Sequence, residues 1–200
     1  MKMFRMTTAA ALLLITLAVA GPLAAAEYTI DLSHSTIGFQ VRHLAISKTT
    51  GSFGDYTGSF SYVAGQPANW ACQTTIQAAS INTNNEKRDE HLRSEDFLDV
   101  AKFPTLTFTS TGVAMANESE GVLMGDLTIH GITKPVELEL ELLGEVTDPW
   151  GNERAGFSAT VKINRKDFGL TYNSVMETGG LVVGEEVKIT LEIEGIKNKE

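Results

Sequence analysis

The chain has 200 residues, of which 42% are hydrophobic, and its formal net charge at pH 7 is −9. This length suits a single domain with a substantial core. The negative charge disfavours binding to the phosphates of nucleic acids, and the single cysteine, Cys72, excludes a disulfide bond within the chain.

The first 26 residues have the pattern of an export signal. Lys2 and Arg5 precede the apolar run AAALLLITLAVA, a Gly-Pro pair ends that run, and small residues follow. The run is shorter than the roughly 20 residues that a membrane-spanning helix needs. We therefore predict a cleavable signal peptide over residues 1–26, rather than a membrane anchor, and a single mature domain over residues 27–200.

Apolar and polar residues alternate along most of the remaining chain. In PVELELELLG, for example, Val136, Leu138 and Leu140 share one face while the glutamates share the other. A period of two places successive side chains on opposite faces of a strand. We predict about eight strands, the first two segments of which can be one bent strand, near residues 28–32, 36–43, 53–63, 71–82, 104–112, 122–130, 135–147, 154–164 and 186–195.

Turn-forming residues separate these strands. The segment HGITKP contains Gly131 and predicts a tight hairpin, while DPWGN over residues 148–152 predicts another turn. Sequential antiparallel strands that each have one apolar face favour a closed barrel with the apolar faces inside. The sequence therefore predicts an all-β fold, an extended antiparallel β-barrel of about eight strands with a short helical insertion.

The helical insertion is expected in NNEKRDEHLRSEDFLDVAKFP, which covers residues 84–104 and interrupts the alternation. Asn84 or Asn85 can cap a short, solvated helix at this position. Pairs of opposite charge with helical spacing are Asp89 with Arg93 and Lys87 with Glu90. The apolar underside of the helix and its following loop is expected to consist of Leu92, Phe97, Leu98 and Val100.

The acidic residues of this insertion are candidates for acid–base catalysis, but their setting argues against it. They lie on an exposed helix with arginines between them, whereas a catalytic carboxyl needs burial or a close charged neighbour. The four histidines are scattered, without a spacing typical of metal ligands. We therefore predict no catalytic residue, no metal site and no cofactor.

Four segments carry a resemblance to a known family. EKRDEHLRSEDFLDVAKFPTLTFTST, GDLTIHGITKPVELEL, DPWGNERAGFSATVKINRKDFGL and GGLVVGEEVKITLEIEG are similar to the YceI family, and the resemblance covers essentially residues 27–200. It implies a lipocalin-like barrel that holds a polyisoprenoid or similar amphiphilic lipid, and a periplasmic location that agrees with the export signal. The implied role is sequestration or transport of a polyprenyl or quinone-precursor chain, not catalysis. The implied partner is a hydrophobic lipid, and a homodimer and transient membrane contact are compatible with this role.

The resemblance also implies where the ligand binds. An eight-stranded barrel is wide enough either to fill with side chains or to enclose one small apolar ligand. The expected wall residues of the lumen are Phe39, Val41, Phe60, Ile76, Phe97, Phe103, Phe108, Leu138, Leu140, Phe157, Phe168, Tyr172 and Met176. The expected polar residues at the mouth are Arg42, His43, Arg88, Asp89, His91 and Arg93, of which the last four match the family motif RD-x-HLRS.

Two questions stay open at this level. The charged residues of the insertion either contact a ligand head group or anchor the helix to the barrel. The alternatives to a lipid carrier are an enzyme that acts on a bound lipid through the acidic helix, and a structural or stress-response protein with a solid barrel.

Overall fold

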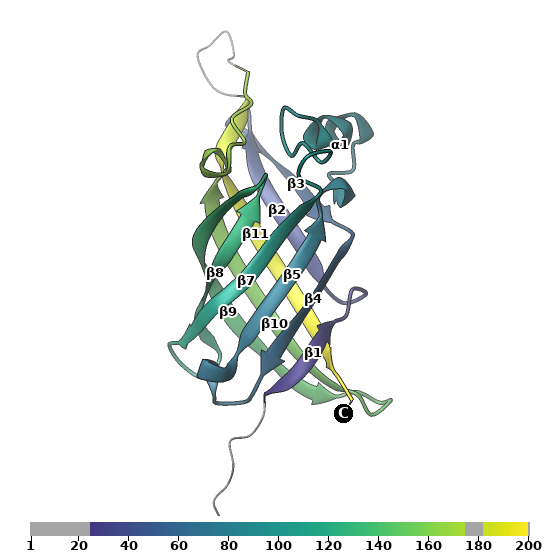
Figure 1. Ribbon diagram of the computed structural model, residues 1–200, viewed down its shortest axis with the longest axis vertical. Helices are drawn as coiled ribbons and strands as arrows, with labels where there is room; N and C mark the ends of the chain where they lie inside the picture. Colours follow the sequence, from purple (N-terminus) through teal and green to yellow (C-terminus); the bar gives the residue numbers. More distant parts are fainter. Residues whose placement is uncertain (1–24, 175–181, 200) are drawn as a thin grey trace, which may run out of the picture.

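A computed structural model describes residues 25–174 and 182–199, and Figure 1 shows its arrangement. Within these residues the chain forms eleven β-strands and the α-helix α1 (Glu86–Arg93). Short 3₁₀ turns lie at η1 (Pro67–Asn69), η2 (Ala78–Ser80) and η3 (Arg165–Phe168). The strands are β1 (Ala26–Ile30), β2 (Thr36–His43), β3 (Ser47–Phe53), β4 (Tyr56–Tyr62), β5 (Ala71–Gln77), β6 (Ile81–Asn82), β7 (Thr105–Met115), β8 (Glu120–Ile129), β9 (Ile132–Thr147), β10 (Glu153–Asn164) and β11 (Val183–Lys197).

The strands close into an antiparallel barrel of eight strand positions. The order β1-β4-β5-β7-β8-β9-β10-β11 returns to its start because β11 also pairs with β1. β11 pairs with β1 near its end and with β2 along the rest of its length, so β1 and β2 are two parts of one bent strand. In the same way β3 pairs with β2 while β4 pairs with β1. The predicted fold, including the bent first strand, is therefore confirmed.

The alternating pattern places the apolar residues inside this barrel. On β9, Leu138 and Leu140 are buried while Glu137, Glu139 and Glu141 between and beside them are exposed. A charged residue at an inward position would be costly to bury without a partner, so the pattern fixes which face of the strand turns inward. The interior is consequently a continuous apolar core that every long strand shares.

Two parts of the predicted strand pattern are wrong. The segment 47–53, SKTTGSF, was not predicted as a strand because it has almost no apolar alternation, yet it pairs with β2 over its whole length. The predicted strand 71–82 is interrupted by η2, and only Ile81 and Asn82 continue as β6. In both cases pairing with a neighbouring strand, rather than the local pattern, decides the structure.

The turns are as the sequence predicts. His130 and Gly131 connect β8 to β9 with φ values of 52° and 73°, the two positive values that a tight two-residue hairpin requires. Between β9 and β10, Gly151 has a φ of 84°, and the Asp148 carboxylate accepts hydrogen bonds from the backbone of Trp150 and Asn152. These turns keep consecutive strands in register.

The barrel has two distinct ends. In Figure 1, α1 lies beside the upper end, and the β9–β10 hairpin and the C-terminus lie at the lower end. In the part of the chain that the structure describes, no helix is long and apolar enough to cross a membrane.

Candidate functional site

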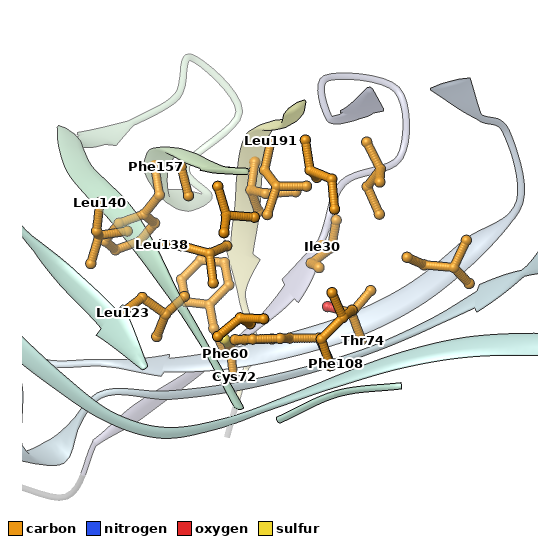
Figure 2. A pocket seen from close by; sticks show the side chains of 18 of the residues that line it. Ile30, Phe60, Cys72, Thr74, Phe108, Leu123, Leu138, Leu140, Phe157 and Leu191 are labelled. Carbon is orange, nitrogen blue, oxygen red and sulfur yellow. The ribbon is translucent and has the colours of Figure 1, made fainter. Parts of the chain in front are cut away.

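The barrel encloses an apolar cavity of about 160 Å³. Side chains from every described strand except β6 contribute to its wall. Figure 2 shows the cavity in close-up, with the hydroxyl of Thr74 among carbon-rich side chains. None of the described residues that line it is charged. A cavity of comparable size, about 150 Å³, is known to stay dry and to hold one benzene molecule, so a longer chain requires the lumen to widen.

Seven of the predicted wall residues line this cavity. They come from β2, β4, β5, β7, β9 and β10, and they are Phe39, Phe60, Ile76, Phe108, Leu138, Leu140 and Phe157. Cys72 also lines it, as its parity on the strand suggests, and burial raises the pKa of its thiol to about 11. Whether these residues contact a ligand stays a prediction.

The other predicted wall residues do not line the cavity. Val41 lies beyond it on β2, and Phe168 is buried in the core beside the cavity. Met176 lies outside the described residues. Phe97 and Phe103 were expected to turn toward the lumen because they follow the charged helix, but they pack among residues at the upper end, as does Tyr172.

Sequence reasoning missed several lining residues. On β8 the run Val122, Leu123 and Met124 is apolar without alternation, so the pattern does not say which side chain points inward. Trp70 shares strand parity with Cys72 and Ile76, which predicts an inward side chain, but it is not among the predicted wall residues. The missed lining residues include Ile30, Phe53, Trp70, Leu123, Leu127 and Leu191.

Five aromatic rings meet at the lower end of the cavity, and we call them the aromatic cluster: Tyr28, Phe60, Tyr62, Trp70 and Phe157. Tyr28 and Phe60 stack with ring centroids 5.0 Å apart, and Phe157 meets Phe60, Tyr62 and Trp70 edge-on at 5.3–5.8 Å. Two polar atoms of the cluster are hydrogen-bonded: Trp70 Nε1 donates to the carbonyl of Val63, and the Tyr62 hydroxyl donates to Glu145. Burial, with Glu145 beside it, raises the pKa of Tyr62. The cluster therefore closes the lower end by apolar packing.

Helix α1 is held at the upper end by its charged residues. Asp89 is only 5% exposed, and its Oδ1 accepts hydrogen bonds from the backbone N–H of Thr83 at 2.9 Å and from the Thr83 hydroxyl at 2.5 Å. Arg88 donates to the Thr83 hydroxyl and carbonyl at 2.6 and 2.7 Å. The Asn85 side chain caps the helix by accepting from the backbone N–H of Arg88.

Arg93 completes this attachment. It donates to the carbonyls of Ala79 and Ile81, at 2.7 and 2.9 Å, and so reaches back to η2 and β6. The predicted pairing of Asp89 with Arg93 is therefore wrong, because both side chains turn toward the barrel instead of along the helix. The predicted pair of Lys87 with Glu90 is not found among the ion pairs of the described residues either.

Three rings join α1 to the segment that follows η3, and we call them the upper latch: His91, Phe97 and Tyr172. The ring centroids lie 4.9–5.1 Å apart in all three pairs. His91 Nε2 also lies 2.8 Å from a carboxylate oxygen of Asp96. The latch is partly exposed, so it links α1 to the barrel without a large buried core.

The remaining residues predicted at the mouth do not converge on the cavity. Arg42 is exposed on β2, and His43 is half-buried at the end of that strand. Phe103 packs on His130 with ring centroids 4.4 Å apart, and it lies so close over Gly131 that a β-carbon there would fall 2.5 Å from the ring. His130 is therefore a packing residue of the hairpin.

Arg165 was not singled out from the sequence, although its position makes it a structural anchor. It is 3% exposed, and it donates from Nε to the carbonyl of Gly184 and from Nη1 to that of Leu170. Burial lowers its pKa. Among the described residues, Nη2 has no hydrogen-bond partner. Arg165 thus ties η3 to the beginning of β11.

One group of side chains within residues 25–174 and 182–199 comes close enough to hold a metal ion: Asp31, His34 and Glu194, on the outer wall. Arg154 donates to Asp31 and Glu194, and also to Asp148 at 2.8 Å. A guanidinium already supplies positive charge to these carboxylates, so the group is accounted for as an ion-pair network.

The similarity of the whole chain to known proteins agrees with this architecture. The model of the YceI-like domain matches residues 28–195. The chain belongs to the YceI family. Protein YceI of Salmonella newport (strain SL254) is 42% identical over 181 residues, which cover 90% of this chain and 91% of that protein.

Solved structures of similar proteins have the same fold. The YceI protein of Campylobacter jejuni is 33% identical, with a TM-score of 0.68 over 80% of this chain and 90% of that one. BcnA of Burkholderia cenocepacia has a TM-score of 0.73 at 21% identity, over 82% and 98% of the two chains. A polyisoprenoid-binding domain from Saccharophagus degradans has a TM-score of 0.64 at 18% identity, over 86% and 98%.

Proposed function

We propose that the protein is a periplasmic carrier that holds a long isoprenoid-like chain, such as a polyprenyl or quinone-precursor lipid, inside the barrel. The observation that carries this proposal is the enclosed cavity, whose described lining residues are apolar apart from the hydroxyls of Ser61 and Thr74. The family membership supports it, and so does the polyisoprenoid-binding domain that shares the fold. The predicted signal peptide supports export to the periplasm.

The arrangement of the charged residues favours binding over catalysis. Asp89 is bonded to Thr83 and His91 to Asp96, and neither lines the cavity. An enzyme acting on a bound lipid needs its acid or base within hydrogen-bond reach of the reacting atoms. We therefore propose that the charged residues of α1 anchor the lid, and that the protein works without a cofactor.

The energetics suit reversible loading from a membrane. Burial of one methylene group from water contributes about 0.8 kcal/mol, which would make release of a long chain into water very slow. A bilayer interior is as apolar as the lumen, so transfer between the two changes the free energy little. Chain length then matters because the lumen widens and the lid moves to accept each additional unit.

Organic extraction and mass spectrometry of the exported, purified protein test this proposal. The wild type is expected to carry an isoprenoid-like lipid. Ala159→Leu, which adds bulk to a lining residue on β10, should reduce the bound lipid several-fold. Thr160→Leu is the matched control, because the next residue of the strand faces outward. A ligand-free wild type, or equal lipid in Ala159→Leu, would contradict the proposal.

A further inference from the structure

Three phenylalanine rings in the cavity wall lie close over glycines. Phe39 covers Gly51, Phe108 covers Gly125, and Phe60 covers Gly195. All three rings line the cavity. The glycines occupy inward positions: Gly51 is the register partner of Phe39, and Gly125 and Gly195 continue the inward series of their strands. At each of these positions the phenylalanine ring fills the space that the side chain of a residue other than glycine would occupy.

The contact is so close that a β-carbon on any of these glycines would require the ring to shift. A β-carbon on Gly51 would lie 2.7 Å from Cε1 of Phe39, with Cζ nearer still. A β-carbon on Gly125 would lie 2.5 Å from Cε2 of Phe108, and one on Gly195 would lie 2.5 Å from Cζ of Phe60. Carbon atoms in favourable contact are about 3.5–4.0 Å apart.

A ring displaced by such a β-carbon has more free space on the cavity side than toward the strands. The backbone of the glycine strand lies behind it, and neighbouring strands lie about 4.8 Å away on either side. The cavity lies in front of it. A methyl group on the glycine would therefore push the ring into the lumen and narrow it.

We propose that these three glycines set the width of the lumen and thereby select methyl-branched chains over straight ones. This inference rests on the proposed function and adds the residues that determine its specificity. A methyl-branched chain is wider than a straight chain at every branch, so it depends on rings that lie against the wall. Narrowing of the lumen should therefore weaken the binding of a branched chain more than the binding of a straight chain.

Phytol and hexadecanol are suitable probes, because they share a main-chain length and an alcohol head but only phytol carries methyl branches. The affinities of the full chain for both are measured by displacement of a fluorescent fatty alcohol. The wild type should bind phytol at least as tightly as hexadecanol. Gly195→Ala should weaken phytol binding relative to hexadecanol by roughly fourfold or more, the contribution of one buried methyl group.

Gly195→Ala is the preferred variant because its next contact, Cβ of Tyr28 at 3.1 Å, needs to shift by only a few tenths of an ångström. Gly51→Ala is the second variant, since its β-carbon also meets Cγ2 of Thr83 at 2.8 Å. Gly156→Ala is the matched control. It adds the same methyl group to the residue before Phe157, but Gly156 does not line the cavity and the nearest atom would be 3.6 Å away.

Shortening the ring gives a test that does not depend on the stability of the glycine variants. Phe60→Leu in the Gly195→Ala background, and Phe39→Leu in the Gly51→Ala background, should restore the preference for phytol. Phe60→Leu alone should widen the lumen and increase that preference.

The outcomes separate the inference from the proposed function. A wild type that binds neither alcohol contradicts lipid binding itself. A wild type that binds both, with an unchanged phytol-to-hexadecanol ratio in Gly195→Ala and Gly51→Ala, overturns the inference and leaves lipid binding intact. A loss that Gly156→Ala shares, or that the shortened rings fail to reverse, also overturns it.

Discussion

The two ends of the barrel are held in different ways. The lower end is closed by aromatic rings, which come from three strands and from the residue before a fourth and pack against one another. At the upper end a helix is attached by hydrogen bonds that involve Asp89, Arg88 and Arg93. Opening the lower end would leave a large apolar void, which is costly. A hydrogen bond at the upper end can be exchanged for one with water at a net cost of about 1 kcal/mol. The difference favours the upper end, beside α1, as the entry for the proposed ligand.

The largest effect is expected from removing a ring of the aromatic cluster. Trp70→Ala deletes a side chain that contacts Tyr62 and Phe157, and we expect it to lower the free energy of unfolding by about 3–5 kcal/mol. Denaturant unfolding followed by circular dichroism measures this. Trp150→Ala is the control, because Trp150 is 81% exposed and its loss should change stability by about 0.5 kcal/mol or less. Equal effects of the two substitutions would show that the cluster does not close the lower end.

A smaller and more local effect is expected at the upper end. Asp89→Ala removes a buried carboxylate that accepts two hydrogen bonds from Thr83, which should cost about 1.5–3 kcal/mol. Faster hydrogen exchange should be confined to α1 and its flanking loops, and a bound lipid should dissociate faster. Glu90→Ala, at an exposed position of the same helix, should leave both rates unchanged. If exchange instead accelerated across the whole barrel, α1 would be part of the core rather than a lid.

Lowering the pH tests the ion-pair network on the outer wall, which belongs to neither end of the barrel. Hydrogen bonds from Ser33, His34 and Arg154 hold the pKa of Asp31 well below its usual value near 4. A carboxylate whose pKa is lowered in the folded state stabilises that state at pH values above its usual pKa. This contribution is lost as the pH falls below the usual pKa. The free energy of unfolding should therefore decrease below about pH 4, and it should decrease less in the Asp31→Asn variant. Parallel pH profiles for the two proteins would contradict this role of Asp31.

The smallest effect is kinetic and concerns Cys72. Burial raises the pKa of its thiol to about 11, so alkylation by iodoacetamide at pH 8 should be slow and should accelerate as the pH rises. Because Cys72 lines the cavity, a bound lipid should slow alkylation further without unfolding the protein. Rapid alkylation that lipid leaves unchanged would place the thiol outside the lumen.

The sequence predicts the barrel well because alternation is a property of each strand alone. Leu138 and Leu140 could be assigned to the interior from their glutamate neighbours, and His130 and Gly131 to a hairpin from turn chemistry. The strand β3 could not be predicted, because its extended structure depends on pairing with β2 and not on an alternating pattern of its own.

The upper end was harder to predict for a physical reason. The spacing of Asp89 and Arg93 fits a helical ion pair, but both side chains find partners on Thr83, Ala79 and Ile81, which only the folded chain brings near. The covering of glycines by rings has a similar origin. It depends on which residues face each other across strands, and alternation within one strand carries no such information.

Photochemical crosslinking tests the central claim, that the barrel interior holds a hydrophobic chain, most directly. A prenyl alcohol with a diazirine at its tail is bound to the full protein, irradiated, and its attachment sites are mapped by mass spectrometry. The account predicts attachment to lining residues such as Leu138, Leu140 and Phe157. Attachment only to exposed apolar residues such as Val146 and Trp150, or no attachment at all, would contradict it.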